Sequence, residues 1–241
     1  MRLRLIRHAT VVLSIGGKTF LVDPMLDAAG ERPPVENTPN QRRNPLVELP
    51  EPAAVVVQGI DAVLVTHLHQ DHLDQTAIGL LPKDVPLFCA PGDVETLSDH
   101  GFADLRPVDD SVEWEGVRVT RTDGVHGPLG PSPGFVIGSV YVAGDTVWCD
   151  EARAAVDTHR PAVIVVNASG ARFLEGGPLV MTTDDVVAVA RHAPDAHVVA
   201  VHLEAINHCL ETRADLHQRL HEEGLTGQVT VPEDGAEVPL R

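Results

Sequence analysis

The sequence predicts a mixed fold of the α/β or α+β class with two β-sheets, and two observations lead to this prediction. Short apolar runs of strand length recur along the chain, and segments with helical spacing of apolar residues lie between several of them. The expected strands are so numerous that they imply a second sheet. No internal repeat is visible, and a length of 241 residues suits one large domain or two small ones.

The first residues have a pattern typical of a β-hairpin. Leu3 and Leu5 alternate with other residues, and residues 11–15 form a β-branched run. The Gly16-Gly17 pair signals a turn, and residues 19–22 return as the next strand. We therefore expect antiparallel strands joined at this glycine pair.

The other expected strands are short and apolar, which suits strands that are buried on both faces. They cover residues 62–66, 86–90, 117–122, 135–137, 140–143, 162–166, 197–201 and 228–231. Four helices are expected between some of these strands, from the spacing of apolar residues and from residues that favour helix ends. They cover residues 93–100, 150–159, 183–192 and 211–223.

Residues 30–52 interrupt this alternation, because they are rich in proline and polar residues and have no hydrophobic period. A loop of this length in a compact domain is usually functional or disordered. Its polar side chains are candidates for a lid over a site, and its arginines for contacts with an anionic substrate group. These residues are Asn37, Asn40, Arg42, Arg43 and Asn44. A plain surface loop is the alternative.

Composition limits the partners that the chain can have. Aspartate and glutamate number 35 against 18 lysines and arginines, and a net charge of −17 argues against non-specific binding to nucleic acid or anionic membranes. No apolar run approaches the ~20 residues that span a bilayer. Three distant cysteines (Cys89, Cys149 and Cys209) form no CxxC pair, which favours a reducing cytoplasm. We expect a small-molecule substrate, and a homo-oligomer stays open.

Thirteen histidines stand against only eight aromatic residues, and three of these histidines cluster after one expected strand. The stretch Thr66-His67-Leu68-His69-Gln70-Asp71-His72 follows residues 62–66, at the end of a strand where α/β proteins place their sites. His67 and His69 are two apart and project to one side of an extended segment, whereas Asp71 and His72 can face a second point. Imidazole and carboxylate ligands suit zinc, manganese or iron. The alternative is a solvated polar loop.

Three later residues supply the complement that a six-residue cluster lacks. His126 follows the expected strand 117–122, Asp145 follows 140–143, and His202 follows 197–201. Each of them alone is more often a loop or core residue. With the first cluster they make seven candidate metal ligands at strand ends.

With these residues in place, the chain resembles the metallo-β-lactamase fold superfamily over nearly its whole length. THLHQDH matches the histidine-rich motif of that family, and His126, Asp145 and His202 match the later ligand motifs in order and spacing. Asp23 resembles the structural aspartate of the first motif. The resemblance implies a four-layer αββα sandwich in a single domain over residues 1–241. The short chain is similar to the branch that includes ascorbate-6-phosphate lactonase.

The same resemblance implies a dinuclear site. His67, His69 and His126 would hold one divalent ion, Asp71, His72 and His202 would hold the second, and Asp145 would bridge them. Two ions, zinc or alternatively manganese, would share a hydroxide that attacks a small ester, lactone, amide or phosphoester. His69 stands where the diiron oxygen-reducing branch has glutamate, which favours hydrolysis. A mononuclear iron dioxygenase of the persulfide type and a non-catalytic metal-binding module are the alternatives.

Further candidates surround these ligands. Asp71 could relay a proton, and His208 is a candidate catalytic residue one loop beyond His202. Asn207 and Arg213 are candidates for substrate contacts, with a solvated helix start as the alternative for Arg213. His8 is a candidate to support the ligands, with a plain core histidine as the alternative.

Overall fold

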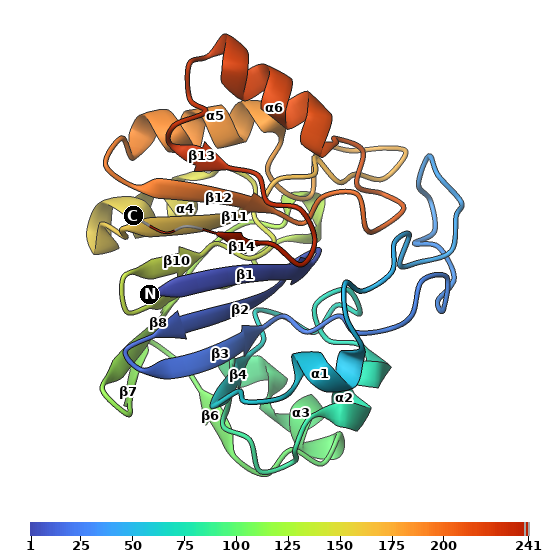
Figure 1. The fold of residues 1–241 in the computed structure, drawn as a ribbon, viewed down its shortest axis with the longest axis vertical. Helices are drawn as coiled ribbons and strands as arrows, with labels where there is room; N and C mark the ends of the chain where they lie inside the picture. The colour runs from blue at the N-terminus through green and yellow to red at the C-terminus, as the bar shows by residue number, and fades with distance from the viewer. Residues whose placement is uncertain (239, 241) are drawn as a thin grey trace.

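Two facing β-sheets form the centre of the computed structural model, which describes residues 1–238 and 240 (Figure 1). The first sheet has the strand order β14-β1-β2-β3-β4-β5-β6. Its strands are β1 (Arg2–Arg7), β2 (Thr10–Ile15), β3 (Lys18–Val22), β4 (Ala62–Leu64), β5 (Leu87–Cys89), β6 (Leu105–Pro107) and β14 (Glu237–Val238).

The second sheet has the order β13-β12-β11-β10-β9-β8-β7. Its strands are β7 (Ser111–Trp114), β8 (Val117–Thr122), β9 (Gly134–Ile137), β10 (Val140–Val142), β11 (Val163–Asn167), β12 (His197–Val201) and β13 (Val229–Thr230). Each sheet begins as an antiparallel meander and continues as parallel strands, from β3 to β6 in one and from β10 to β13 in the other. The carboxyl ends of parallel strands meet at one edge of each sheet, and this edge carries the site described below.

Helices cover the outer faces of both sheets (Figure 1). The first sheet is covered by α1 (Ala53–Val56), α2 (Gln75–Leu80) and α3 (Val94–Asp99), and the second by α4 (Asp150–His159), α5 (Thr183–His192) and α6 (Arg213–Glu222). Two 3₁₀ turns, η1 (Pro91–Asp93) and η2 (Gly127–Leu129), complete the regular structure. The layers are therefore helix, sheet, sheet and helix, which confirms the predicted four-layer sandwich.

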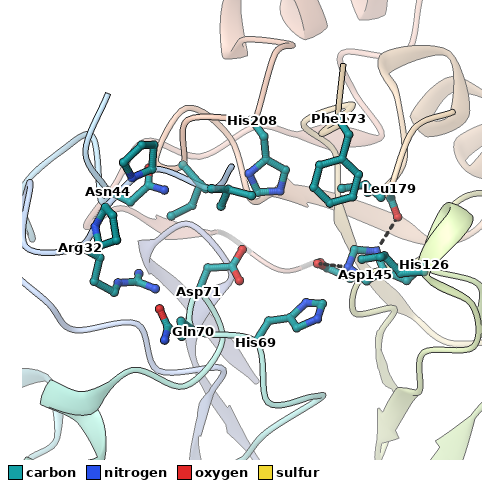
Figure 2. Close-up of a pocket in the computed structure, with 15 residues that line it drawn as sticks. Arg32, Asn44, His69, Gln70, Asp71, His126, Asp145, Phe173, Leu179 and His208 are labelled. Carbon is teal, nitrogen blue, oxygen red and sulfur yellow. Dashed lines mark hydrogen bonds and ion pairs between the residues drawn. The ribbon is translucent and has the colours of Figure 1, made fainter. Parts of the chain in front are cut away.

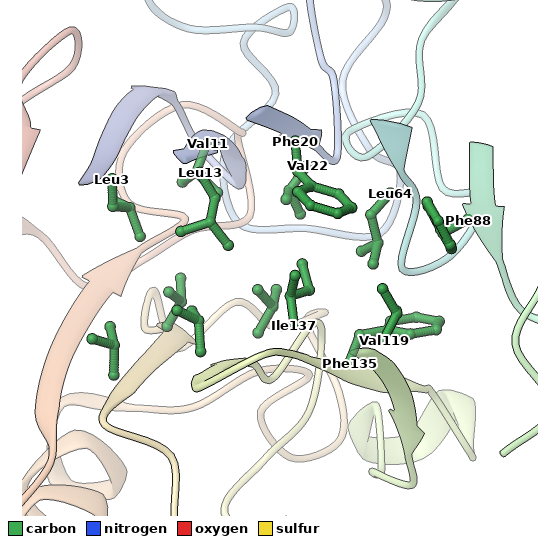
Figure 3. Packing of buried hydrophobic residues seen from close by; sticks show 14 of the residues in the cluster. Leu3, Val11, Leu13, Phe20, Val22, Leu64, Phe88, Val119, Phe135 and Ile137 are labelled. Atoms are coloured by element: carbon green, nitrogen blue, oxygen red, sulfur yellow. The ribbon is translucent and has the colours of Figure 1, made fainter. Parts of the chain in front are cut away.

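Alternation along the strands divides the apolar residues between the layers. In β3, Phe20 and Val22 face the other sheet, whereas Leu21 packs under the helices of its own side. The inter-sheet core contains four aromatic side chains, Phe20, Phe88, Trp114 and Phe135. The ring centroids of the first three lie 5.5–5.9 Å apart, and Figure 3 shows Phe20, Phe88 and Phe135 in this layer. This apolar layer holds the two sheets face to face.

The structure differs from the expected elements mainly where they are short or polar. Helices α4 and α5 and strands β8 and β12 have the expected bounds. Helix α6 begins two residues later than expected, because Thr212 and Asp215 form a capping box at its start. Strand β7 was not expected, since only Trp114 in it is buried.

The long segment between β3 and α1 follows an irregular path along the molecule, and buried Arg7 anchors it. The Arg7 guanidinium donates to the backbone carbonyls of Met25, Asp27 and Val47, each at 2.9 Å. Burial lowers the pKa of Arg7 to about 10, which leaves it charged at neutral pH. One buried cation thus binds both ends of the segment. Among the described residues, no helix has the length and apolar character needed to cross a bilayer.

Candidate metal centre

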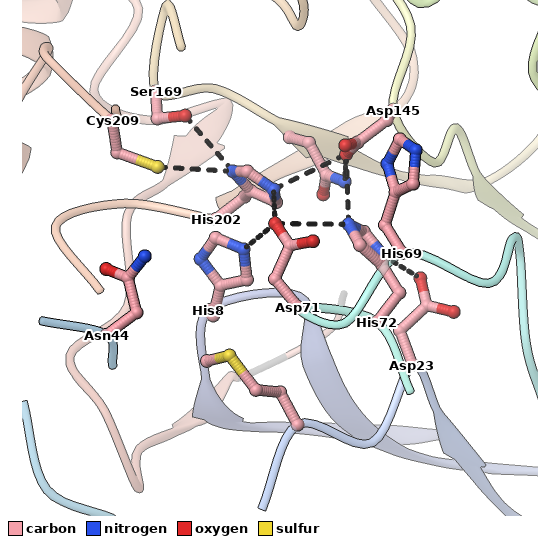
Figure 4. A network of polar contacts seen from close by, with 12 residues as sticks. His8, Asp23, Asn44, His69, Asp71, His72, Asp145, Ser169, His202 and Cys209 are labelled. Atoms are coloured by element: carbon pink, nitrogen blue, oxygen red, sulfur yellow. Dashed lines mark hydrogen bonds and ion pairs between the residues drawn. The ribbon is translucent and has the colours of Figure 1, made fainter. Parts of the chain in front are cut away.

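The seven ligands expected from the sequence converge at the carboxyl edge of the two sheets. Figure 4 shows five of them, His69, Asp71, His72, Asp145 and His202. Four of the seven come from the loop between β4 and α2, and the others follow β8, β10 and β12. Together with His8 they form two groups of four, and within each group one ligand atom per residue lies within 4.8 Å of the others. The first group is His67, His69, His126 and Asp145, and the second is His8, Asp71, His72 and His202.

Asp145 lies between the two groups. Its Oδ2 lies 3.4 Å from His126 Nε2 and 3.7 Å from His67 Nε2. Its Oδ1 lies 3.3 Å from His72 Nε2 and 3.4 Å from His202 Nε2. One carboxylate oxygen therefore faces each group, which is the arrangement expected of a bridging ligand.

His8 joins the second group, although the sequence offered it only as a supporting residue. Its Nε2 lies 3.2 Å from Asp71 Oδ2, and its ring stacks on His202 with centroids 3.6 Å apart. His8 and His202 both have positive φ values, of 60° and 66°, and the His202 N–H donates to the His8 carbonyl at 2.9 Å. Positive φ is unfavourable for residues with a side chain and is concentrated at functional sites.

The donor atoms fit divalent cations. His72 Nε2 and His202 Nε2 are buried, and neither forms a hydrogen bond with another described residue. The opposite nitrogen of each ring is occupied, because His72 Nδ1 lies 2.8 Å from Asp23 and His202 Nδ1 lies 3.1 Å from Ser169 Oγ. His126 Nδ1 likewise lies 2.8 Å from the Leu179 carbonyl. Such partners fix the ring orientation and leave the inner nitrogen free to bind a metal.

Two further side chains orient the carboxylates and the loop. Asp23 accepts hydrogen bonds from the backbone N–H and the hydroxyl of Thr66, at 2.7 and 2.8 Å. This contact fixes the start of the histidine-rich loop against β3. Asn167 donates its side-chain amide to Asp145 Oδ1 at 2.6 Å. The structural role expected for Asp23 therefore has a direct geometric basis.

Burial and charge act in opposite directions on the ligands. Burial opposes the ionisation of Asp145, but His72 and His202 outweigh it and hold its pKa well below the usual value. Burial also opposes protonation of His202, but Asp145 and Cys209 outweigh it and raise its pKa to about 10. The pKa of His67 is lowered by burial and by neighbouring His72. A cation that enters the site must therefore displace protons from the second group.

A cavity of about 390 Å³ opens over the ligands (Figure 2). Its floor contains His69, Asp71, His126 and Asp145, and its polar walls contain Arg32, Asn44, Gln70 and His208. The rest of the lining is apolar and consists of Pro33, Pro34, Val35, Leu129, Phe173, Leu179 and Ile206. The site is therefore a small, mostly apolar pocket with metal-binding groups at its base.

The residues expected to contact substrate have different positions. His208 lines the cavity, its Nδ1 has no hydrogen-bond partner among the described residues, and burial lowers its pKa. Asn207 is buried and does not line the cavity. Its side chain binds the irregular segment near Val35 and Asn44 instead.

The predicted substrate contact of Arg213 is wrong, because its guanidinium is fully engaged by groups of the protein itself. Its Nε donates to the Pro232 carbonyl at 3.0 Å, and its two Nη atoms pair with Glu204 and Asp234 at 2.5 and 2.6 Å. The side chain is buried outside the cavity. No donor of Arg213 is directed at a substrate.

The long loop agrees with the prediction only in part, because Asn44 lines the cavity, whereas Asn37, Asn40, Arg42 and Arg43 do not. Arg43 is exposed and donates to the carbonyls of Gly30 and Glu31, so it does not face the cavity. The arginine at the cavity wall is Arg32, whose Nε lies 2.8 Å from Asp27 Oδ2. No motif marks Arg32 in the sequence, and only the fold brings it to the site.

Comparisons with known proteins agree with this geometry. The family described as "Beta-lactamase superfamily domain" matches residues 18–203. "UPF0173 protein YddR" of Bacillus subtilis (strain 168) is 36% identical over 98% of both chains. A "possible metal-dependent hydrolase" from Veillonella parvula DSM 2008 has a TM-score of 0.95 and 33% identity over 100% of this chain and 99% of its own.

A second solved structure is similarly close. The isothiocyanate hydrolase from Delia radicum gut bacteria has a TM-score of 0.94 and 33% identity over 99% of this chain and 98% of its own. A "UPF0173 metal-dependent hydrolase" of Metallosphaera sedula is 28% identical over 76% of this chain and 78% of its own. The chain described here therefore belongs to the metallo-β-lactamase superfamily and is a metal-dependent hydrolase.

Proposed function

We propose that the chain is a dinuclear hydrolase of a small molecule, with zinc or alternatively manganese in both positions. The observation that carries this proposal is the position of Asp145, which turns one carboxylate oxygen to each ligand group. Imidazole and carboxylate ligands in two adjacent groups suit these ions. When bound, two such ions supply a water of lowered pKa and neutralise negative charge that develops on the substrate.

The chain's own residues would bind and orient the substrate. His208 and Asp71 lie on different sides of the cavity (Figure 2). The lowered pKa of His208 keeps its ring neutral at pH 7, so one ring nitrogen can donate a hydrogen bond and the other can accept one. We assign His208 the role of hydrogen-bond donor to the reacting oxygen or leaving group. Asp71 holds the second ligand group and is a candidate proton relay.

The cavity walls point to the substrate class. Leu129, Phe173 and Ile206 offer an apolar surface, so the substrate should carry an apolar substituent. Arg32 is the cation on the lining, and Asp27 already offsets its charge. A small neutral electrophile therefore fits better than a phosphoester. Esters, lactones and amides satisfy this description, and an isothiocyanate is added because the Delia radicum gut enzyme with 33% identity hydrolyses that class.

A metal-reconstitution assay tests the proposal. Protein stripped with a chelator should lose activity against a panel of an aryl ester, a lactone, an anilide, a phosphodiester and phenyl isothiocyanate. Activity should return with Zn²⁺ or Mn²⁺. His67→Ala should be inactive, whereas His192→Ala, a surface histidine paired with Asp157, should keep full activity. A folded His67→Ala protein with undiminished activity would refute the assignment.

The same preparation separates the alternatives. About one iron per chain with oxygen consumption would favour the persulfide-type dioxygenase. Inactivity across the whole panel with both metals loaded would favour a non-catalytic binding module. We also propose a small-molecule substrate and no nucleic-acid or membrane partner, the latter supported by the net charge of −17. A cytoplasmic location is proposed from the three distant cysteines, which form no CxxC pair.

A further inference from the structure

One wall of the cavity belongs to the irregular segment between Arg32 and Asn44. Arg32, Val35 and Asn44 line the cavity, yet the segment forms no helix or strand. Its two ends are joined by a single isolated bridge, in which the Arg32 and Asn44 backbones exchange hydrogen bonds of 2.8 and 2.9 Å. A wall without a regular ladder needs another element to fix its shape.

Asn207 supplies this element from the loop after β12. Its Oδ1 accepts from the Val35 N–H at 2.9 Å and from Asn44 Nδ2 at 2.7 Å. Its Nδ2 donates to Thr38 Oγ1 at 2.7 Å and also to the carbonyls of Val35 and Asn40. Its backbone N–H donates to Asn44 Oδ1 at 2.9 Å. The side chain is fully buried, and both its acceptor and its donor atoms are engaged.

The position of Asn207 in the chain joins this segment to the opposite wall. Its neighbours on either side, Ile206 and His208, both line the cavity. Asn37 extends the connection, because its carbonyl accepts from the N–H of Leu174, which follows the lining residue Phe173. Any shift of Asn207 therefore changes the distance between two walls.

We propose that Asn207 is a positioning residue that locks residues 32–44 against the His208 loop and so sets the shape of the substrate cavity. This role replaces the direct substrate contact expected from the sequence. The effect on turnover depends on the proposed function, whereas the effect on the segment itself does not. The two can therefore be tested separately.

The experiment compares two isosteric substitutions in the metal-loaded protein. Asn207→Asp keeps the shape but replaces the donor nitrogen with an oxygen that faces backbone carbonyls. Gln228→Glu is the matched control, because Gln228 Nε2 also donates to three carbonyls, those of Ala190, Ala193 and Ala196. Gln228 precedes β13 and lies at the sheet edge opposite the cavity.

Backbone amide hydrogen exchange is the first measurement. Asn207→Asp should exchange about tenfold faster across residues 32–44 than the wild type, the factor that a loss of about 1.4 kcal/mol in local stability gives. Gln228→Glu should leave this segment unchanged. If Asn207→Asp does not fold, Thr38→Val removes one acceptor and should give a smaller change in the same segment. Equal exchange of this segment in the wild type and in Thr38→Val and Asn207→Asp would overturn the proposal.

Kinetics with phenyl isothiocyanate and the ester panel are the second measurement. Asn207→Asp should raise KM severalfold with a smaller change in kcat and an unchanged metal content. If residues 32–44 exchange faster in Asn207→Asp but KM is unaltered, this wall does not set the shape of the substrate cavity, and the positioning role is overturned. If the wild type turns over no probe, the proposed function fails, but hydrogen exchange still decides whether Asn207 locks the segment.

Discussion

Replacing Asp23 with asparagine should weaken metal binding, although Asp23 is not itself a ligand. Its Oδ1 accepts from the Thr66 N–H, and its Oδ2 lies 2.8 Å from both the Thr66 hydroxyl and His72 Nδ1. In Asp23→Asn the backbone donor keeps the remaining oxygen in place, so the new NH₂ group faces His72. His72 must then accept on Nδ1 and carry its proton on Nε2, which blocks the nitrogen that turns to the metal site.

The expected magnitude follows from the loss of this orientation. Partners of metal-binding histidines contribute about 10–100-fold to metal affinity, which corresponds to about 1.4–2.8 kcal/mol. Competition with a chromophoric chelator measures this affinity. Only the ion held by the group that contains His72 should bind more weakly. Spectroscopic titration of the histidine ring by NMR should show the changed tautomer.

Asp215→Asn is the matched control for this prediction. Asp215 also accepts from the backbone N–H and the hydroxyl of a threonine, Thr212, but it does so in the exposed capping box of α6. This variant should lose about 0.3–1 kcal/mol of stability, because asparagine keeps an accepting oxygen but removes a charge from the first turn of the helix, and it should lose no metal affinity. Equal metal affinities in Asp23→Asn and Asp215→Asn would refute the reasoning.

Three further outcomes are expected. His208→Leu removes the donor and should keep both ions while lowering kcat about 10²–10³-fold, as measured by steady-state kinetics beside metal analysis, and an unchanged kcat would remove His208 from the reaction. Nearby carboxylates raise the pKa of His202 to about 10 and that of His72 well above its usual value, so metal binding should release protons from these rings. Metal affinity should therefore rise with pH by about tenfold per pH unit for each proton displaced. Calorimetry in buffers of different ionisation enthalpy measures this release, and a binding heat that is the same in every buffer would contradict it. Arg213→Met should destabilise the fold by about 1.5–3 kcal/mol in denaturant unfolding, because the partly exposed Glu204 and Asp234 carboxylates lose their charged hydrogen bonds. A loss below about 0.5 kcal/mol would show that the network is not needed.

Most of the helices and strands that could be predicted from the sequence were predicted from patterns within a few neighbouring residues. Helix α5 has its apolar residues on one face and a capping box at its start, and both signals are contained within a few residues. Strand β7 and helix α1 escaped prediction, because β7 buries only Trp114 and α1 has a single turn that buries only Val56. Short elements depend on neighbours that the sequence does not place beside them.

The site residues also fall into those that are close together in the sequence and those that meet only in the fold. The ligands from His67 to His72 lie within six residues, so their spacing alone pointed to a metal. His8 approaches Asp71 across 63 residues, and Asn207 binds Val35 across 172 residues. Such contacts arise only when both sheets have formed, which explains why Asn207 and Arg213 were expected to contact substrate although they support the fold instead.

Metal stoichiometry in single-ligand variants tests the dinuclear centre most directly. His126 belongs only to the first group and His202 only to the second, whereas Asp145 faces both. After loading with Zn²⁺ and desalting, elemental analysis should find about two ions per chain in the wild type, about one in His126→Ala and in His202→Ala, and fewer still in Asp145→Ala. A single ion in the wild type that His202→Ala retains and His126→Ala loses would contradict the dinuclear account.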